Sequence, residues 1–146
     1  MIRRGLRCDV PEIVELARHF WRETIYDEPF CADSVRLMVE LAHEQGLLAV
    51  LEEEAGVVGF VAGCKGALLG NAAVLTGTEL AWWIEPEYRQ GRKGIELMQY
   101  IERLAREQGI RYWTMVSMES SSPETANRIY QRLGYAKTET SFTKVL

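Results

Sequence analysis

The spacing of apolar residues changes along the chain between the helical and the strand period, and these changes predict its elements. Four segments have the helical spacing: 10–24, 33–45, 94–106 and 123–133. Six segments read as strands: 2–7, 47–51, 57–64, 74–84, 112–118 and 135–146. Glycine follows three of the predicted helices, at 46, 109 and 134, and is the residue typical of a left-handed C-cap.

The predicted order is therefore β-α-α-β-β-β-α-β-α-β, with a loop over 65–73 between the third and fourth strands. Three strands in succession followed by strand–helix–strand units indicate an α/β (α+β) fold. We expect a mixed, mostly antiparallel sheet with helices on both faces. No linker or low-complexity segment interrupts the pattern, so we expect residues 1–146 to form a single domain.

Composition narrows the possible partners. The 146 residues carry a net charge of −4, which argues against a general nucleic-acid binder. Three cysteines at wide spacing form no disulfide framework, and the two histidines have no metal-ligand partner in sequence, so we expect a reducing cytoplasm and no metal. The start of the chain does not read as a signal peptide, and no apolar run approaches the ~20 residues that span a bilayer, so no membrane partner is expected.

Residues 84–94, Ile-Glu-Pro-Glu-Tyr-Arg-Gln-Gly-Arg-Lys-Gly, are the most informative stretch. They join a predicted strand to a predicted helix through two glycines and three cations, Arg89, Arg92 and Lys93. The first backbone N–H groups of a helix have no partner within it, and the helix dipole adds partial positive charge there. The sequence thus predicts a site for a phosphate or pyrophosphate, with a small polyanion favoured over a polymer because the rest of the chain is acidic.

This loop, the later run Ala126-Asn-Arg-Ile-Tyr130-Gln-Arg-Leu-Gly134-Tyr135 and the order of elements together resemble the GNAT acyl-CoA N-acyltransferases. The resemblance covers essentially the whole chain and is strongest to short, single-domain bacterial and phage-type members. It implies that the protein transfers an acetyl group from acetyl-CoA directly to a primary amine, on a small molecule or a protein. No cysteine stands beside a base, so a covalent acyl-enzyme is not favoured.

The resemblance also implies which residues bind the co-substrate. Three residues at the end of the strand would line the pantetheine and the acyl group: Trp82, Trp83 and Ile84. The loop and the start of the helix would hold the pyrophosphate: Arg89, Gln90, Gly91, Arg92, Lys93, Gly94 and Ile95. The chain departs from the family pattern at two positions. Arg92 stands where the family commonly has its first loop glycine, and Pro123 stands where many members have an asparagine that contacts the cofactor.

Tyr130 matches the position of the family's general acid. Its reference pKa near ~10 is close enough to the ~8.5 of a thiol for it to protonate a departing thiolate. The alternative is a helix tyrosine packed on the core with its hydroxyl satisfied locally. A backbone N–H near Ile84 is the expected oxyanion donor.

Glu79 is the first candidate for the base that deprotonates the amine, directly or through a water. Strand alternation places Glu79, Ala81 and Trp83 on one face of the sheet, unless a β-bulge changes the parity. An ordinary strand-edge carboxylate is the alternative reading of Glu79. Glu119, at the end of the following predicted strand, is the second candidate for the base.

The acceptor stays open between a polyamine, an antibiotic, an amino acid and a protein amine. Four aromatic residues near the first helix form one expected wall of its site: Phe20, Trp21, Tyr26 and Phe30. With Asp27 and Glu28 they could hold a cationic amine, or they could simply pack in the core beside an acidic turn. A non-catalytic acyl-CoA-binding or protein-interaction module is the alternative function, and the final strand could pair in a homodimer.

Overall fold

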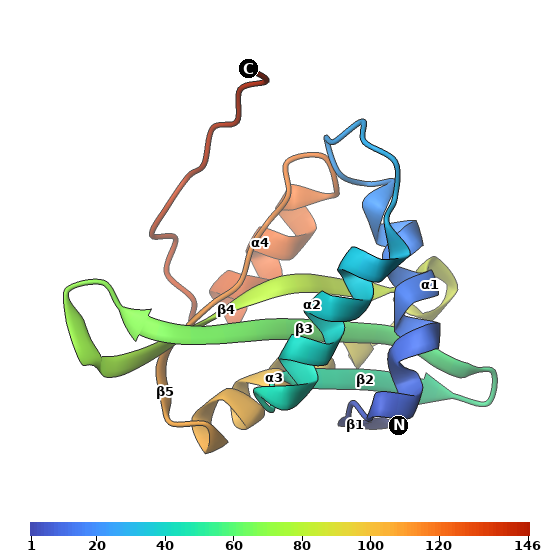
Figure 1. Ribbon diagram of the computed structural model, residues 1–146, viewed down its shortest axis with the longest axis horizontal. Helices are drawn as coiled ribbons and strands as arrows, with labels where there is room; N and C mark the ends of the chain where they lie inside the picture. Colours follow the sequence, from blue (N-terminus) through green and yellow to red (C-terminus); the bar gives the residue numbers. More distant parts are fainter.

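A five-stranded sheet in the order β1-β2-β3-β4-β5 forms the centre of the computed structural model, which describes all residues from 1 to 146 (Figure 1). The first four strands are antiparallel neighbours: β1 (Ile2–Arg4), β2 (Leu48–Glu53), β3 (Gly56–Leu68) and β4 (Asn71–Ile84). Strand β5 (Ile110–Thr114) runs parallel to β4, because the chain returns through helix α3 (Lys93–Glu107) before pairing. The expected mixed, mostly antiparallel sheet is confirmed.

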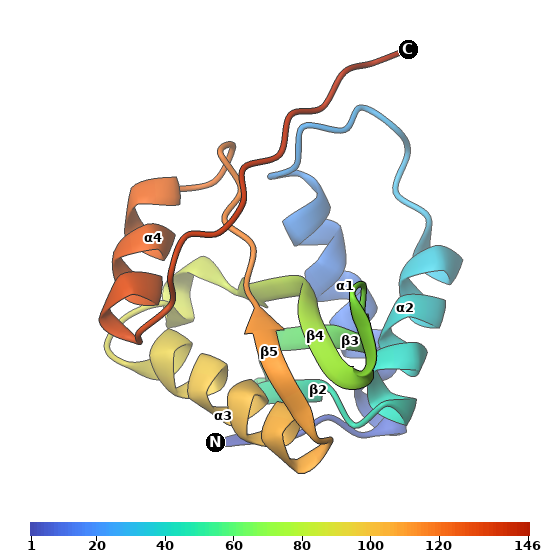
Figure 2. The ribbon, with the colours of Figure 1, turned by 90° about the vertical axis from the view of Figure 1, so that its left-hand side faces the viewer.

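Helices cover both faces of this sheet, as expected (Figure 2). One face carries α1 (Val10–Trp21) and α2 (Ala32–Glu44), and the other carries α3 with α4 (Pro123–Arg132) on the same side. Two short 3₁₀ turns, η1 (Arg7–Asp9) and η2 (Pro86–Tyr88), precede α1 and follow β4. Alternate residues of the central strands point to opposite faces of the sheet, each of which has its own hydrophobic core. Phe60 packs in the core under α1 and α2 (the α1–α2 core), and Val61 packs in the core under α3 (the α3 core). None of the helices is both long and apolar enough to cross a membrane.

The predicted last strand is wrong. Residues 135–146 form no helix or strand and run away from the sheet toward the C-terminus (Figure 1). Apart from Tyr135, whose hydroxyl donates to Glu102 Oε1 at 2.8 Å, the segment is exposed, including Phe142 at 95%. Its apolar residues are too few and too scattered to bury a continuous face, so alternation alone does not give it a place in the sheet. A homodimer through this segment stays a prediction.

The predicted loop over 65–73 is also wrong, because β3 and β4 continue into one long hairpin that turns at Leu69-Gly70 (Figure 1). Gly66 pairs with Thr76 and Ala67 with Leu75, so the glycine belongs to a strand. Strand β5 is likewise displaced from the predicted 112–118. It begins directly after Gly109, whose φ of +74° ends α3, and residues 115–118 leave the sheet.

A β-bulge at Leu80 changes which way Glu79 faces. Ala62 of β3 lies opposite Ala81, but the next residue, Gly63, lies opposite Glu79, so Leu80 has no partner. Ala81 belongs to the α1–α2 core, whereas a side chain on Gly63 would meet Trp113, which packs against the α3 core. Glu79 therefore lies on the α3 face. Glu79 does not share a face with Ala81 and Trp83, because the β-bulge that was expected to change the parity is present and strand alternation resets there.

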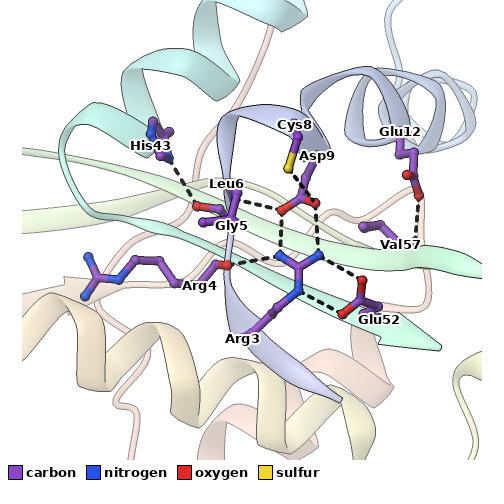
Figure 3. A network of polar contacts seen from close by, with 10 residues as sticks. All are labelled: Arg3, Arg4, Gly5, Leu6, Cys8, Asp9, Glu12, His43, Glu52 and Val57. Carbon is purple, nitrogen blue, oxygen red and sulfur yellow. Dashed lines mark hydrogen bonds and ion pairs between the residues drawn. The ribbon is translucent and has the colours of Figure 1, made fainter.

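A cluster of charged residues joins β1, the turn η1 and β2 (Figure 3). Arg3 donates to both carboxylate oxygens of Asp9, at 2.7 and 2.9 Å, and to both of Glu52, at 2.9 and 3.0 Å. Asp9 also accepts the Leu6 N–H at 2.7 Å. The Asp9 side chain thus pairs with Arg3 and makes no cap bond to the first turn of α1. We call these three residues the Arg3 cluster.

Candidate active site

The candidate active site is a pocket that opens where β4 and β5 separate. The two strands pair only from Leu75 to Thr78 on β4, so the β4 edge from Glu79 to Ile84 has no strand partner on that side. A pocket of about 500 Å³ fills the gap. It is bordered by this edge of β4, the residues after β5, the inner side of α4 and the end of α1 with the loop that follows it.

Glu79 and Tyr130 meet at one residue, Val116, in the wall of this pocket. The Val116 N–H donates to Glu79 Oε2 at 2.9 Å, and the Tyr130 hydroxyl donates to the Val116 carbonyl at 2.6 Å. The two side chains come from β4 and α4, and Val116 lies in the connection between β5 and α4. The structure therefore brings together the two residues predicted as base and acid, on either side of a shared peptide segment.

Glu79 is buried, with 8% of its surface exposed, and carries no ion-pair partner. Burial raises the pKa of Glu79 to about 7, and the hydrogen bond from the Val116 N–H opposes this rise. A carboxylate with a pKa near neutrality can both accept a proton and release it again at physiological pH. The environment of Glu79 thus suits a general base better than it suits an ordinary strand-edge carboxylate.

Tyr130 is also buried, and its ring lies 6.2 Å from that of Trp82 and 5.6 Å from that of Tyr135. Burial, and after it the charge of Glu79, raise the pKa of Tyr130 above its ordinary value. The phenol consequently stays protonated throughout the physiological range. It keeps a proton to donate, but the raised pKa makes the phenol a weaker acid toward a thiolate, and in this structure the proton is donated to the Val116 carbonyl.

Three polar atoms in the pocket wall are buried without any hydrogen-bond partner: Trp82 Nε1, Trp83 Nε1 and Ser117 Oγ. Buried donors without partners are rare in folded proteins because each one costs about 1–3 kcal/mol. Their concentration in one pocket indicates groups that a ligand can satisfy. Ser117 was not predicted from the sequence, since nothing about a serine after a strand distinguishes it. The predicted residues Trp82 and Trp83 are both in the wall.

The loop between β4 and α3 leaves the start of α3 open. No side chain caps the first turn of the helix, so its free N–H groups remain available to an anion. Gly91 has a φ of +77°, a conformation that favours glycine. A side chain on Gly94 would lie 3.4 Å from the Trp82 ring, so glycine keeps the space between helix and strand free. Gln90 is exposed and Ile95 half-buried beside them.

The three cations of this loop lie in different environments. Arg89 donates from Nε to the Ile84 carbonyl at 2.7 Å, and its guanidinium lies 4.4 Å from the centre of the Trp83 ring. Lys93 pairs with Glu53 at 2.7 Å. Arg92 is exposed and makes no ion pair. Of the three, Arg92 is therefore the cation most available to a polyanion, and it stands at the position that departs from the family pattern.

The remaining candidates separate into two groups. Phe20, Trp21 and Tyr26 border the pocket, with the Trp21 and Tyr26 rings stacked at 5.7 Å. Four do not border it: Phe30, Asp27, Glu28 and Glu119. The Phe30 ring packs under Arg18 at 4.5 Å, and the three carboxylates are exposed. The geometry favours Glu79 over Glu119 as base.

A family model for the acetyltransferase (GNAT) domain matches residues 44–137, from the end of α2 to the start of the C-terminal tail. The chain belongs to the GNAT acetyltransferase family. This GNAT protein also has the family's fold: 255 solved chains match it. A predicted acetyltransferase from Clostridium acetobutylicum, solved with acetyl-CoA, has a TM-score of 0.75 and 16% identity over 99% of this chain and 95% of that one.

Two further solved structures differ in what they are described as acting on or binding. A ribosomal-protein-alanine N-acetyltransferase from Brucella melitensis has a TM-score of 0.74 and 14% identity over 100% of this chain and 99% of that one. AAC(6')-Iy, solved with the bisubstrate analog CoA-S-monomethyl-acetylneamine, has a TM-score of 0.75 and 16% identity over 100% of this chain and 97% of that one. At these identities the likeness extends to the fold alone. No curated protein matches the chain.

Proposed function

We propose that residues 1–146 form a single acetyltransferase domain that transfers an acetyl group from acetyl-CoA to a primary amine. In this proposal Glu79 is the general base and Tyr130 the general acid. The observation that carries it is the arrangement at Val116. The Glu79 carboxylate and the Tyr130 hydroxyl are bonded to the N–H and the carbonyl of this one residue, inside the pocket between β4 and β5.

The residues present fit acetyl-CoA, which when bound supplies an acetyl group activated as a thioester. The unpaired β4 edge at Trp82, Trp83 and Ile84 offers backbone groups to the pantetheine arm. The indole N–H of Trp82, on the α3 side, has no hydrogen-bond partner within the chain. The loop from Arg89 to Ile95 offers the pyrophosphate the open N-terminus of α3, and Arg92 supplies an unpaired cation.

The proposed reaction forms a C–N bond and breaks the C–S bond of the thioester. An ammonium must first lose one proton to become a nucleophile, and the nitrogen loses a second one as the amide forms. Glu79 accepts a proton from the nitrogen, directly or through a water, and passes it on. The sulfur gains one proton from Tyr130, which is reprotonated from solvent, so that one proton is released overall for each ammonium acetylated.

Glu79 and Tyr130 are coupled in a direction that favours this sequence. The negative charge of Glu79 is one of the causes that raise the pKa of Tyr130. When Glu79 takes up the proton of the amine, that contribution is removed, and Tyr130 becomes a stronger acid. The Tyr130 hydroxyl must then turn from the Val116 carbonyl to the sulfur. Proton uptake at the base thus prepares the acid for the next step.

Acetyl-CoA binding by the purified protein is the first test, measured by titration calorimetry. We expect wild-type protein to bind and Arg92→Glu to bind at least about tenfold more weakly, because the change reverses the unpaired charge at the start of α3. Turnover is then measured as thiol release with a panel of amines. Tyr130→Phe should abolish most of it, whereas Tyr135→Phe should not, because the Tyr135 hydroxyl bonds Glu102 and does not border the pocket.

The outcomes separate this proposal from its alternative. Binding together with turnover that depends on Tyr130 supports the acetyltransferase. Binding that survives in Glu79→Gln and Tyr130→Phe, with no acceptor acetylated by the wild type, would instead support a non-catalytic acyl-CoA-binding module. Absence of binding in a folded protein would contradict both.

A further inference from the structure

The two neighbouring tryptophans of β4 border the pocket from opposite faces of the sheet. Trp82 packs with the α3 core, whereas Trp83 belongs to the α1–α2 core, where the Phe20 ring meets it edge-on at 6.3 Å. Trp83 is 7% exposed and its indole N–H has no partner. The pocket wall thus contains a buried donor on the α1 side that no group of the chain satisfies.

Arg89 adds a cation on the same side. Its guanidinium lies over the Trp83 ring, and only Nε is used, by the Ile84 carbonyl at 2.7 Å. The two terminal nitrogens make no hydrogen bond or ion pair, although Arg89 borders the pocket. A guanidinium with free terminal nitrogens, beside an unpaired indole N–H, presents the donor arrangement that a carboxylate accepts.

The pocket holds few groups that would attract a second positive charge. Glu79 is the only carboxylate in its wall, and it lies on the α3 face as the proposed base. Asp27 and Glu28, which the sequence offered for a cationic amine, do not border the pocket, and Glu85 pairs with His19. The other residues on the α1 side are three aromatic ones, Phe20, Trp21 and Tyr26, and the uncharged Thr24.

We propose that the acceptor is an amino acid with an apolar side chain, bound by its carboxylate. The carboxylate accepts hydrogen bonds from Trp83 Nε1 and the terminal nitrogens of Arg89. The side chain packs against the aromatic wall from α1 and its loop, and the amine lies at the open edge of β4, from which its proton reaches Glu79 on the α3 face through a water. This assignment rests on the proposed acetyl transfer and names its acceptor class. In this assignment the indole N–H of Trp83 binds the acceptor, whereas the backbone of Trp83 binds the pantetheine arm.

Three matched acceptors test the proposal: phenylalanine, phenylalaninamide and phenethylamine, which share a side chain and differ at the carboxylate. We expect kcat/KM for phenylalanine to exceed that for phenethylamine by about 100-fold or more, with the amide between them. A site built around a charged hydrogen-bonding group discriminates strongly against an analogue that lacks it. Equal or higher kcat/KM for phenethylamine would overturn the proposal, as would a marked preference for a polyamine such as spermidine.

Variants then identify the residues responsible. Trp83→Phe removes the N–H and keeps a ring, and Arg89→Met removes the charge and keeps an apolar stem. At saturating acetyl-CoA, each should lower the ratio of kcat/KM for phenylalanine to kcat/KM for phenethylamine at least about tenfold, because any effect on the shared co-substrate cancels in that ratio. Trp82→Phe is the matched control and should leave this ratio unchanged, since its indole N–H lies on the other face. An equal loss of discrimination in Trp82→Phe, or none in Trp83→Phe, would contradict the assignment.

Calorimetry of the same compounds with the CoA-saturated protein separates this proposal from the proposed catalysis. Tighter binding of phenylalanine than of phenethylamine, lost in Trp83→Phe, would support the carboxylate site even if no acetylation were observed. Turnover of amines without any preference for a carboxylate would leave the acetyltransferase standing and reject the amino-acid acceptor. Circular dichroism of each variant shows that it is folded.

Discussion

Two groups of polar side chains in this protein are built in opposite ways. In the Arg3 cluster, three guanidinium nitrogens are used and both oxygens of Asp9 are bonded (Figure 3). In the pocket between β4 and β5, two indole N–H groups and the hydroxyl of Ser117 have no partner. The hydrogen-bonding groups of the Arg3 cluster are satisfied within the chain, whereas the pocket contains buried donors without partners.

The two groups also shift their carboxylates in opposite directions. The hydrogen bonds from Arg3 hold the pKa of Asp9 below its usual range, whereas burial raises the pKa of Glu79 to about 7. The ionised form of Asp9 therefore stabilises the fold, and the ionised form of Glu79 destabilises it. The comparison shows that the charges of the Arg3 cluster stabilise the fold. The charge of Glu79, where β4 and β5 separate, destabilises it, as is common for groups at functional sites.

Glu79→Gln should have the largest effect on activity. Removing a general base is expected to lower kcat by about 10²- to 10⁴-fold, because the amide cannot take the proton of the amine. In the wild type, kcat/KM should rise with pH through about 7 as Glu79 ionises, and the variant should lose this step. The measurement is thiol release from pH 5.5 to 9. Glu119→Gln, at an exposed carboxylate outside the pocket, should retain both the rate and the profile.

Asp9→Asn should have the largest destabilising effect. It removes the charge of the buried Asp9 carboxyl from Arg3, which is partly exposed and keeps Glu52 as a partner, so we expect a loss of about 2 kcal/mol, the scale of hydrogen bonds to a charged group. Urea unfolding at pH 7 measures the change. Glu44→Gln is the control, since its pair with Arg7 is exposed at both ends and should contribute less than about 1 kcal/mol. Equal effects of the two variants would mean that the Arg3 cluster does not stabilise the fold more than an exposed pair does.

Glu79→Gln should also stabilise the fold at alkaline pH. A carboxyl with a folded pKa of about 7 and an unfolded pKa of 4.5 binds its proton more tightly in the folded state. Its contribution therefore falls as pH rises from 4.5 to 7 and stays unfavourable above that. We expect the variant to gain roughly 1–3 kcal/mol over wild type at pH 8 and much less at pH 5, by chemical unfolding. A gain that does not depend on pH would show that ionisation of Glu79 is not the cause.

A pair of serine variants gives the smallest effects. Ser117→Ala removes an unpaired buried hydroxyl and should be neutral or stabilising by up to about 1 kcal/mol. Ser120→Ala removes a hydroxyl that donates to the Glu23 carbonyl at 2.6 Å and should destabilise by about 1 kcal/mol. Thermal unfolding compares them. Destabilisation by Ser117→Ala equal to that of Ser120→Ala would mean that the Ser117 hydroxyl already has a partner in solution.

The sequence predicted the parts of this molecule that depend on local pattern. The four helices follow apolar spacing, and the left-handed glycines at 46, 109 and 134 follow C-cap chemistry. Tyr130 and Glu79 were named from a motif and a position in a strand, and the structure brings them to the same pocket. These features need only a few neighbouring residues to be read.

Features that depend on pairing between distant segments were missed. Residues 135–146 alternate like a strand but pair with none, and Gly66 looked like loop while pairing with Thr76. The face of Glu79 depends on an unpaired Leu80 opposite β3, which no alternation within β4 can reveal. Ser117 stands out only once its buried hydroxyl is seen without a partner.

The bulge at Leu80 also affects how this protein is compared with its relatives and engineered. Deleting that one residue would restore a regular ladder and leave Glu79 opposite Gly63 on the α3 face, whereas an extra residue in β3 that paired with Leu80 would carry Glu79 to the side of the sheet that holds α1 and α2. An alignment gap placed one position away would therefore match Glu79 to a residue with a different orientation. Moving the Glu79 carboxylate into a related chain at the same sequence position requires moving the irregularity of the strand together with the residue.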